Sequence, residues 1–482
     1  MATMEMCSDL IGGEWVAAAD HASFETRDPA HAADVLAVFP SATAADTAQA
    51  AAAAAEAFPR WAATPAPARG AILFRAAELL TERLEDVART LTREEGKTLP
   101  EARGEVTRAR DILRYFAGEG WRSGGDVLPP NTVNAMLFSR REPLGVVAAI
   151  TPWNFPIAIP AWKIAPALAY GDTVVFKPAS ATPLTALRLV ECLVDAGLPA
   201  GVLNLVTGSG ATVGGALAGD PVVRGLTFTG SHAVGAGIYT RATGHFARVQ
   251  LEMGGKNPTI VLRDADLDLA VRLVVAGGFG LTGQSCTATS RVIVEEAVAD
   301  RFAAALAEAA AALTVGDGLA DGIQMGPAVS EEQLATDLEY VRIAGEEGAE
   351  LLTGGGRAGE GGYFVQPTVF DRVEAHSRLA QEEVFGPVVG IIRARDLDDA
   401  IFKANGVGYG LAAGVVTRDL HRAFSFVDRI EAGVVKVNEP TTGLALQAPF
   451  GGFKLSTANT FKEQGPAALE FYTRTKTVYV TY

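Results

Sequence analysis

The chain has 482 residues, of which 49% are hydrophobic and 20% are charged. This length corresponds to about two to four domains, each large enough to bury a core without covalent cross-links. The formal net charge of −15 argues against nucleic acid or an anionic membrane surface as a general partner. A small anionic substrate stays open, because a few local cations can dominate one pocket.

The cysteine content indicates a reducing compartment. Cys7, Cys192 and Cys286 form an odd and sparse set, which is typical of a cytoplasmic protein and unlike a disulfide framework. Residues 1–11 contain acidic residues and no long apolar run, so we expect no secretory signal. Gly, Pro or charged residues interrupt every apolar stretch before about 18 residues, and we expect no transmembrane helix. We assign no metal ligands.

The first part of the chain predicts helices and then an exposed ribbon. Residues 42–58 are rich in alanine, which favours a surface helix over a flexible linker. Residues 68–95 carry apolar side chains at helical spacing and predict one helix, and residues 101–120 predict another. Residues 121–130 are turn-rich, and residues 131–141 alternate like a strand that is polar on both faces.

From Leu144 the pattern of strand, turn and helix repeats. Strands alternating with helices predict an α/β fold with a Rossmann-type, doubly wound parallel sheet, which binds ligands beyond the carboxyl ends of its strands. A second α/β series runs from about 252 to 435. The last residues, 473–482, alternate and are β-branched, so they are expected to pair with the ribbon or with another subunit. The predicted strands are 145–150, 172–176, 202–206, 225–229, 259–262, 290–294, 388–392 and 411–416, and the predicted helices between the first of them are 184–196 and 211–218.

Cys286 lies in the segment GQSCTATSR (283–291), between a predicted helix at 267–279 and a predicted strand. A loop between two elements can hold a reactive side chain and still leave it accessible. A cysteine thiolate is a nucleophile that can attack a carbonyl carbon. The alternative is a small buried apolar residue, and this is our interpretation of Cys7 and Cys192.

Two polar residues follow predicted strands. Glu252 precedes two glycines in LEMGGKNP (251–258), and a carboxylate at the end of a strand can act as a general base toward water. Asn154 lies in TPWNFP (151–156), where its amide can donate a hydrogen bond to an oxyanion. In isolation each has a simpler interpretation, Glu252 as an exposed acid in a turn and Asn154 as a residue of a Pro-bounded turn.

Four segments follow one another along the chain in this order: TPWNFP, LEMGGKNP, GQSC (283–286) and EEVFGP (382–387). Together they resemble the aldehyde dehydrogenase superfamily, and the resemblance extends from IGGEW (11–15) to KTV (476–478). It implies oxidation of an aldehyde to a carboxylate with NADP or NAD as cofactor. It also implies that Cys286 is the nucleophile, that Asn154 and the main-chain N–H of Cys286 hold the oxyanion, and that Glu252 is the base for deacylation. Lys163 matches a lysine near the active site of this family.

Gly-rich segments follow two of the strands, at 207–210 and 228–235. Main-chain N–H groups at the start of a helix attract phosphate, and Gly permits close approach. Neither segment is a GxGxxG fingerprint, so a structural turn stays open for both. The resemblance places Ser231 and Trp153 near the pyrophosphate and Glu383 and Phe385 at the nicotinamide ribose and ring. The other residues assigned to the cofactor are Thr151, Gly210 and Gly230.

Ser180 bears on the choice of cofactor. It stands in KPAS (177–180), directly after a predicted strand. NAD-selective members of the family often have Glu at this position, which holds the ribose 2′-hydroxyl and repels a 2′-phosphate. Ser180 removes that repulsion and Lys177 adds positive charge, so we expect acceptance of NADP, with NAD also possible. The alternative for Ser180 is an ordinary serine in a turn.

Two subgroups of the family resemble the chain most, those that oxidise succinate semialdehyde and 2-oxoglutarate semialdehyde. The succinate semialdehyde group commonly has Arg where Trp162 stands, and segments 438–443 and 456–465 are more similar to the 2-oxoglutarate semialdehyde group. We therefore expect 2-oxoglutarate semialdehyde as the substrate. Phe155, Trp162 and Phe450 are expected to line its channel. Arg110 is a candidate for its carboxylate, with Arg114 one turn later, although both also fit a solvated helix face.

Other functions stay open at this point. An uncharged aliphatic or aromatic aldehyde is a further possible substrate. A CoA-acylating dehydrogenase or an inactive binding homologue is less favoured, because Glu252, Cys286 and Asn154 are all present. The resemblance implies a homodimer or homotetramer. It divides the chain into a cofactor-binding domain (1–120 and 143–251), a catalytic domain (252–437), an oligomerisation arm (121–142 and 466–482) and a returning segment at the active site (438–465).

Overall fold

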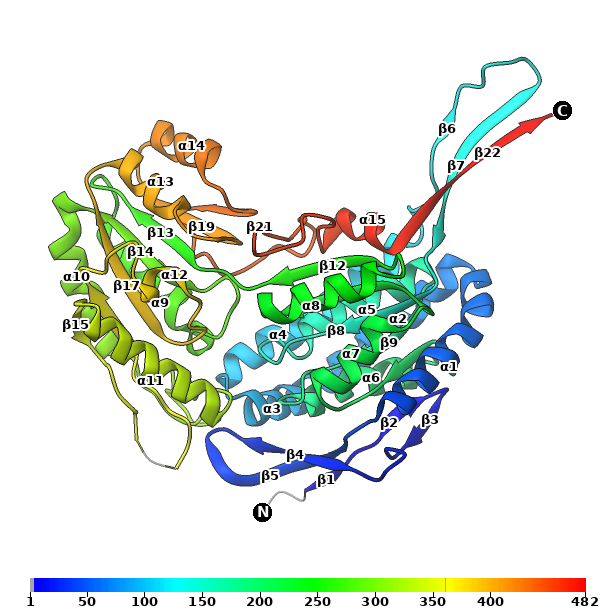
Figure 1. Ribbon diagram of the computed structural model, residues 1–482, viewed down its shortest axis with the longest axis horizontal. Coiled ribbons are helices and arrows are strands. Elements are labelled where there is room, and N and C mark those ends of the chain that lie inside the picture. Colours follow the sequence, from blue (N-terminus) through cyan, green and yellow to red (C-terminus); the bar gives the residue numbers. More distant parts are fainter. Residues whose placement is uncertain (1–3, 360) are drawn as a thin grey trace.

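The computed structural model describes residues 4–359 and 361–482. Two α/β units lie side by side, and a β arm projects from one of them (Figure 1). Each unit is built on a seven-stranded sheet, and the arm is a three-stranded sheet. The α/β class predicted from the sequence, with its parallel sheets and small β arm, is confirmed.

The sheet of the first unit has the strand order β12-β11-β8-β9-β10-β2-β3. Strands β12 to β10 are parallel, and β2 and β3 add an antiparallel edge. The parallel strands are almost continuously apolar because helices cover both of their faces. The chain goes from β8 toward one edge and then returns to β11 on the other side, so the order reverses between β8 and β11. The strands are β2 (Asp9–Ile11), β3 (Glu14–Val16), β8 (Val146–Ile150), β9 (Thr173–Lys177), β10 (Leu203–Leu205), β11 (Val223–Gly230) and β12 (Arg248–Met253).

Two separate apolar clusters form the core on the two faces of this sheet. Helices α1, α7 and α8 contribute to one cluster, and α2 to α6 contribute to the other. None of the helices in residues 4–359 and 361–482 is long and apolar enough to cross a membrane. The helices of this unit are α1 (Ala44–Ala63), α2 (Ala66–Glu82), α3 (Leu84–Glu95), α4 (Leu99–Glu119), α5 (Ala158–Tyr170), α6 (Pro183–Asp195), α7 (Gly215–Gly219) and α8 (His232–Thr243), and a short π-helix covers Gly210–Gly214.

The single helix predicted over 68–95 is wrong, because the chain forms α2 and α3 with a break at Arg83. This residue leaves helical geometry (φ −98°, ψ 7°), and its guanidinium binds Asp195 at 2.6 Å. Val87 and Leu91 stay buried after the bend. The apolar spacing therefore continues from α2 into α3 although the chain bends at Arg83, and no Gly or Pro in the sequence indicates this bend.

The second unit has the strand order β15-β16-β17-β14-β13-β19-β20, and only β15 is antiparallel to its neighbour. Helices α9 and α10 pack on one face, and α12, α13 and α14 pack on the other. The strands are β13 (Asn257–Val261), β14 (Thr289–Glu295), β15 (Glu350–Thr353), β16 (Thr368–Asp371), β17 (Val388–Ala394), β19 (Ala412–Val416) and β20 (Val434–Val437), and the helices are α9 (Leu267–Phe279), α10 (Glu296–Ala311), α11 (Glu331–Glu346), α12 (Arg378–Gln381), α13 (Leu397–Asn405) and α14 (Leu420–Arg429).

The arm consists of β6 (Val127–Leu128), β7 (Ala135–Pro143) and the C-terminal strand β22 (Thr473–Thr481). β22 pairs antiparallel with β7 along its whole length, with Thr477 opposite Ser139. The expected pairing of the last residues with the ribbon is thus confirmed. The returning chain before β22 forms β21 (Phe453–Lys454), which pairs with β18 (Tyr409–Gly410), and the short helix α15 (Ala468–Tyr472).

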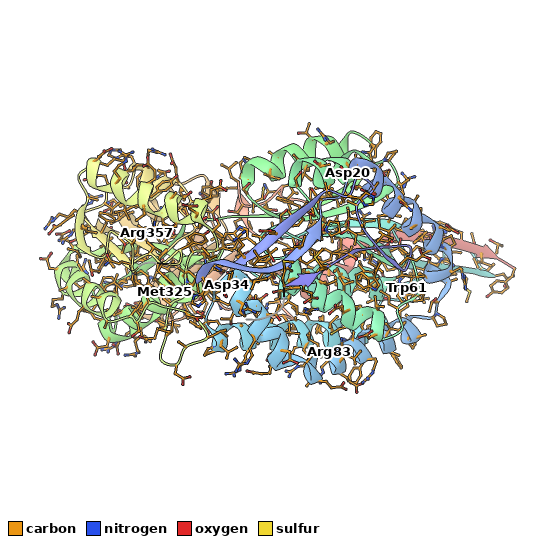
Figure 2. The ribbon with its side chains drawn as sticks, turned by 90° about the horizontal axis from the view of Figure 1, so that it is seen from below. Asp20, Asp34, Trp61, Arg83, Met325 and Arg357 are labelled. Atoms are coloured by element: carbon orange, nitrogen blue, oxygen red, sulfur yellow. The ribbon has the colours of Figure 1, made fainter. Side chains whose placement is uncertain are left out.

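An N-terminal sheet, which the sequence did not predict, joins the two units. It contains β1 (Glu5–Met6), β4 (Ser23–Asp28) and β5 (His31–Pro40). Figure 2, which is viewed from below, shows this ribbon in front of the first unit, with Asp34 at the end nearer the unit that carries Met325 and Arg357. The turn between β4 and β5 binds the second unit, where the N–H of Tyr363 donates to the carbonyl of Pro29 at 2.9 Å.

Candidate active site

Cys286 lies in the loop between α9 and β14, at the edge of the second sheet that faces the first unit. The three residues Leu281, Thr282 and Gly283 have positive φ of 54°, 58° and 68°. Two of them carry side chains, which rarely adopt this conformation, so surrounding contacts must hold it. The N–H of Leu281 donates to Glu101 at 2.8 Å, and the hydroxyl of Thr282 donates to the carbonyl of Gly326 at 3.1 Å.

Asn257, at the start of β13, fixes the loop from the other side. Its amide donates to the carbonyls of Cys286 at 2.8 Å and Ala288 at 2.9 Å. Its own side-chain oxygen accepts from the N–H of Ala412 at 2.9 Å. Sequence reasoning assigned Asn257 no role, although it is part of the LEMGGKNP motif. The spacing within that motif does not reveal a contact with a residue 29 positions away.

Asn154 lies in the loop that follows β8, and it is buried. Its side-chain amide donates to the carbonyl of Gln284 at 3.0 Å, which brings the amide beside the loop that carries Cys286. Gln284 is anchored in turn, because its side-chain oxygen accepts from the N–H of Val329 at 2.9 Å. The structure thus brings Asn154 and Cys286 together from separate units.

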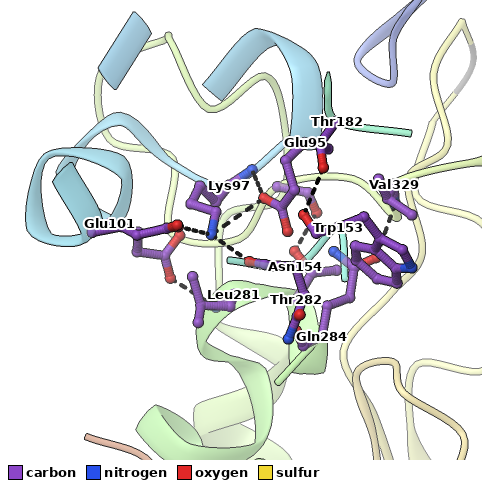
Figure 3. Close-up of polar contacts among 12 residues, drawn as sticks. Glu95, Lys97, Glu101, Trp153, Asn154, Thr182, Leu281, Thr282, Gln284 and Val329 are labelled. Carbon is purple, nitrogen blue, oxygen red and sulfur yellow. Dashed lines mark hydrogen bonds and ion pairs between the residues drawn. The ribbon is translucent and has the colours of Figure 1, made fainter. Parts of the chain in front are cut away.

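A buried charged network holds Asn154 in place (Figure 3). Lys97 donates to the main-chain carbonyl of Asn154 at 2.7 Å and to Glu105 at 2.6 Å. Glu105 also accepts from the N–H groups of Ile157 at 3.0 Å and Ala158 at 3.1 Å, at the start of α5. Both charged side chains are buried, and removing one partner from such a pair is strongly destabilising. No sequence motif pointed to this network.

Glu252 lies near the end of β12 and is buried with both carboxylate oxygens lacking a hydrogen-bond partner among the described residues. Burial raises its pKa well above the ordinary value, and the neighbouring Glu463 adds to the rise. A Cβ atom at Gly451 would lie 2.4 Å from Glu252 Oε1, so a glycine is needed there. Its unused oxygens leave the ionised form of Glu252 free to take a proton, and the raised pKa makes that form a stronger base than an ordinary glutamate.

Lys163 lies on α5 and is buried. It forms an ion pair with Glu463 and donates to the hydroxyl of Thr227 at 2.8 Å. Glu463 belongs to the returning segment, where it exchanges main-chain hydrogen bonds of 2.7 Å with Phe450. Sequence reasoning missed Glu463, although it lies within the 456–465 segment used for comparison.

The Cys286 thiol is partly buried. Burial, with the nearby carboxyl groups of Glu383 and Glu252, raises the pKa of this thiol to about 12. The thiol is therefore neutral near neutral pH in this form of the protein. A nucleophilic thiolate requires either a change in this environment or a base that removes the proton.

The carboxyl ends of β8 and β11 meet where the strand order reverses, and the residues there fit a dinucleotide. The hydroxyls of Thr151 and Thr229 are buried without a hydrogen-bond partner among the described residues. Ser231 is the N-cap of α8, and its side chain makes no capping bond. Gly230 ends β11. Free hydroxyls beside a helix start of positive potential suit a pyrophosphate.

The Ser180 region lies after β9, the next strand of the sheet. Ser180 is exposed, and its hydroxyl donates to the carbonyl of Gly208 at 2.8 Å. Lys177 ends β9 and donates to the carbonyl of Pro178 at 2.8 Å, and burial lowers its pKa to about 8. Gly210 begins the π-helix, with open space around its Cα.

Glu383 and Phe385 precede β17 and approach the first unit. The ring of Phe385 packs edge-to-face on Trp153 with centroids 5.3 Å apart. Glu383 accepts from the N–H of Gly255 at 2.9 Å, and a Cβ atom at Gly254 would lie 2.0 Å from its Oε1. The paired glycines of LEMGGKNP therefore admit this carboxylate, whose pKa is raised by burial to about 7.

Aromatic side chains line the other side of the site. Trp162 and Phe450 lie with ring centroids 6.0 Å apart and are both buried. Phe155 is partly buried, with the ammonium of Lys97 4.6 Å from its ring centre. Of the three aromatic residues that the sequence assigned to substrate, Trp162 and Phe450 thus lie together, and Phe155 follows Asn154 directly in the chain.

The placement of Arg110 does not support its assignment to the substrate carboxylate. Its guanidinium binds Asp111 on the same helix at 2.8 Å. Arg108 instead lies beside Trp162, with its guanidinium carbon 5.8 Å from the ring centre. Two residues correspond to about 200° around a helix, so the side chains of Arg108 and Arg110 leave opposite faces of α4. The apolar spacing of the sequence alone did not show which face of α4 lies against the candidate active site.

Comparisons with known proteins identify the class. The model of the aldehyde dehydrogenase family matches residues 15–478. The chain is 47% identical to the alpha-ketoglutaric semialdehyde dehydrogenase of Bacillus subtilis, over 98% of this chain and 97% of the relative. It is 50% identical to the alpha-ketoglutarate semialdehyde dehydrogenase of Haloferax volcanii, over 98% of this chain and 99% of the relative.

Solved structures with the same fold support the assignment to this family. Betaine aldehyde dehydrogenase from Staphylococcus aureus, in complex with NAD+, superposes with a TM-score of 0.96 at 34% identity and covers 98% of this chain and 94% of its own. An E. coli NADP-dependent enzyme has a TM-score of 0.96 at 40% identity, over 99% and 98% of the two chains. The chain therefore belongs to the aldehyde dehydrogenase family. It is an oxidoreductase that uses NAD(P)+ to oxidise an aldehyde.

Proposed function

We propose that the protein oxidises 2-oxoglutarate semialdehyde to 2-oxoglutarate through a thioester on Cys286. The arrangement that carries the chemistry is the loop of Cys286, which is tied to Asn154 through the hydrogen bond to Gln284. The substrate is supported by two relatives with names of this activity at 47% and 50% identity. Trp162 supports it further, because succinate semialdehyde enzymes commonly have Arg at this position.

The Cys286 thiol first releases its proton to solvent, and the resulting thiolate adds to the aldehyde carbon, whose carbonyl oxygen becomes an oxyanion. The amide of Asn154 and the main-chain N–H of Cys286 donate hydrogen bonds to this oxyanion, and one preorganised donor contributes about 3 kcal/mol. When bound, NAD(P)+ supplies the hydride acceptor that converts the adduct to an acyl thioester.

Glu252 then takes a proton from water, and the resulting hydroxide attacks the thioester carbon. The C–S bond breaks and gives the carboxylic acid and the Cys286 thiolate. The acid then ionises to the carboxylate, and its proton and the proton on Glu252 pass to solvent. The unpartnered oxygens and raised pKa of Glu252 suit this role. Lys163 lies beyond Glu463 and acts on the electrostatics of Glu252 from a distance, because Lys163 and Lys462 both favour the charged form of Glu252.

The cofactor is expected at the crevice between β8 and β11. Thr151, Gly230 and Ser231 are proposed to hold the pyrophosphate, with Trp153 nearby, and Gly210 is proposed to leave room at the adenosine end. Ser180 and Lys177 are proposed to accept a 2′-phosphate, which gives acceptance of NADP+ as well as NAD+. Glu383 and Phe385 are proposed at the nicotinamide ribose and ring.

The arm is proposed to join subunits into a homodimer or homotetramer. Strand β22 lies at the edge of its sheet, and Val127, Met136 and Tyr479 are exposed large apolar residues. Such an edge favours association with a second chain.

The three cysteines are unpaired, which supports a cytoplasmic location.

The proposed function is tested with purified protein and four aldehydes: 2-oxoglutarate semialdehyde, succinate semialdehyde, pentanal and benzaldehyde. Formation of NADPH or NADH is followed by absorbance, with Cys286→Ala assayed beside each. We expect the highest kcat/KM for 2-oxoglutarate semialdehyde and no turnover in the variant. A higher kcat/KM for succinate semialdehyde or for an uncharged aldehyde would show that the substrate is wrong. Turnover that survives Cys286→Ala would show that the mechanism is wrong.

A further inference from the structure

Arg108 lies on α4, between Trp162 on α5 and the returning segment 438–465. Its guanidinium donates to the main-chain carbonyl of Leu444 and, at 3.0 Å, to the side-chain oxygen of Gln464. The guanidinium carbon also lies 5.8 Å from the centre of the Trp162 ring. These contacts hold the cation in one place on the aromatic side of the site.

Arg108 differs from its neighbours on the helix because no described carboxylate pairs with it. Arg103 binds Glu85 at 2.7 Å and Arg110 binds Asp111 at 2.8 Å. The two carboxylates nearest in sequence, Glu105 and Asp111, each three residues away, are already paired with Lys97 and Arg110. Burial lowers the pKa of the Arg108 guanidinium. A partly buried cation without a counter-ion is costly for stability unless its donors are hydrogen-bonded or an anion binds beside it.

The path from Arg108 to the reacting atoms is continuous. Trp162 lies against Phe450 with ring centroids 6.0 Å apart, and Phe450 precedes Gly451, the residue whose backbone approaches Glu252. On the other side, Glu105 is one helical turn before Arg108 and supports the loop of Asn154 through Lys97. Arg108 thus lies at one end of a series of contacts, through Trp162 and Phe450, whose other end reaches the proposed base Glu252.

We propose that Arg108 binds the carboxylate of the aldehyde substrate and thereby determines its specificity. The proposal rests on the proposed function, because it requires a substrate with a carboxylate distant from the aldehyde. The planar guanidinium suits bidentate binding of a carboxylate, and Trp162 supports its face. Trp162 occupies the position at which succinate semialdehyde enzymes commonly carry Arg. In this chain the guanidinium of Arg108, on α4, lies beside the ring of Trp162 and supplies the positive charge instead.

The test compares Arg108→Gln with the wild type on 2-oxoglutarate semialdehyde and on pentanal, which has the same number of carbons and no carboxylate. We expect KM for the semialdehyde to rise at least about 30-fold with a much smaller change in kcat, since removing one partner of a buried charge pair commonly has an effect of this size. The ratio of kcat/KM values, semialdehyde to pentanal, should fall by the same factor.

Three further variants make the result decisive. Arg108→Lys retains the charge without the planar fork and should give an intermediate KM. Arg103→Gln, an exposed arginine of the same helix, should leave both substrates unchanged. Arg110→Gln tests the other candidate for the substrate carboxylate. If KM for the semialdehyde rises in Arg110→Gln and does not rise in Arg108→Gln, the proposal is overturned.

A binding measurement separates recognition from turnover. Calorimetric titration of 2-oxoglutarate into Cys286→Ala should give a dissociation constant that rises at least about 30-fold when Arg108→Gln is added. An equal loss of activity on the semialdehyde and pentanal would instead show that Arg108 supports the returning segment, and would overturn the proposal. If the wild type has a higher kcat/KM for pentanal than for the semialdehyde, the proposed substrate is wrong. If the wild type prefers the semialdehyde and Arg108→Gln keeps the same preference, the substrate is right and only the role of Arg108 is wrong.

Discussion

The side-chain amide of Asn154 donates a hydrogen bond of 3.0 Å to the main-chain carbonyl of Gln284, two residues before Cys286. This bond joins the loop after β8 of the first unit to the loop before β14 of the second. The proposed oxyanion donor and the proposed nucleophile are therefore positioned relative to each other by direct contact across the junction of the two units.

Replacing Asn154 with Ala tests the oxyanion role. We expect kcat to fall about 10²–10³-fold, because one preorganised donor is lost from the charge that develops on the carbonyl oxygen. KM should change little. Steady-state kinetics measure both, and Asn154→Asp, which keeps the size but not the donor, should fall similarly. Full activity in Asn154→Asp would contradict the assignment.

Replacing Glu252 with Gln tests the base. Thioester formation should continue, while hydrolysis should slow about 10²–10⁴-fold for lack of a proton acceptor. Stopped-flow absorbance should then show a burst of about one reduced cofactor per active site, followed by a slow steady rate. Cys286→Ala serves as the control without a burst. Equal slowing of the burst and the steady rate would assign Glu252 to an earlier step.

The raised pKa of Cys286 predicts how the thiol reacts with iodoacetamide. With a pKa of about 12, the thiolate fraction at pH 7 is very small and should increase about tenfold for each pH unit. The alkylation rate of the protein without cofactor should therefore rise steadily up to at least about pH 9, above the ordinary pKa of cysteine. Mass spectrometry identifies the modified residue. A plateau below pH 8 would show that the thiol is activated without any ligand.

Replacing Lys97 with Met should destabilise the protein. Glu105 would stay buried without its partner, and breaking such a pair costs about 3–5 kcal/mol. The free energy of unfolding is measured by urea denaturation at fixed protein concentration. Adding Glu105→Gln should recover part of the loss because it removes the unpaired charge. A single variant as stable as the wild type would show that the network contributes little.

Replacing Ser180 with Glu should weaken the use of NADP+ relative to NAD+. A carboxylate there would repel the 2′-phosphate, so kcat/KM for NADP+ should fall at least about tenfold while that for NAD+ is retained or improved. Kinetics with each cofactor at saturating aldehyde measure this. Ser180→Ala serves as the control for the loss of the hydroxyl alone. Unchanged use of NADP+ in Ser180→Glu would place the 2′-phosphate elsewhere.

The sequence by itself determined the α/β class and the parallel sheet, and it left the last strand with two candidate partners, the ribbon or another subunit. These features depend on local apolar spacing, because buried parallel strands are continuously apolar and exposed ribbons alternate. The motifs around Cys286, Glu252 and Asn154 lie beside strands with a clear pattern, but their roles were inferred from the resemblance to the aldehyde dehydrogenase superfamily.

Only the tertiary structure decided how these loops are held and which arginine meets the aromatic side of the site. Lys97 and Asn154 lie 57 residues apart, and Asn257 and Cys286 come together only through the packing of β13 against β14. Arg108 and Arg110 are two residues apart on one helix, and local pattern treats them alike. The docking of α4 on α5 gives one of them Trp162 as a neighbour and leaves the other with Asp111, because a helix presents residues two positions apart on opposite faces.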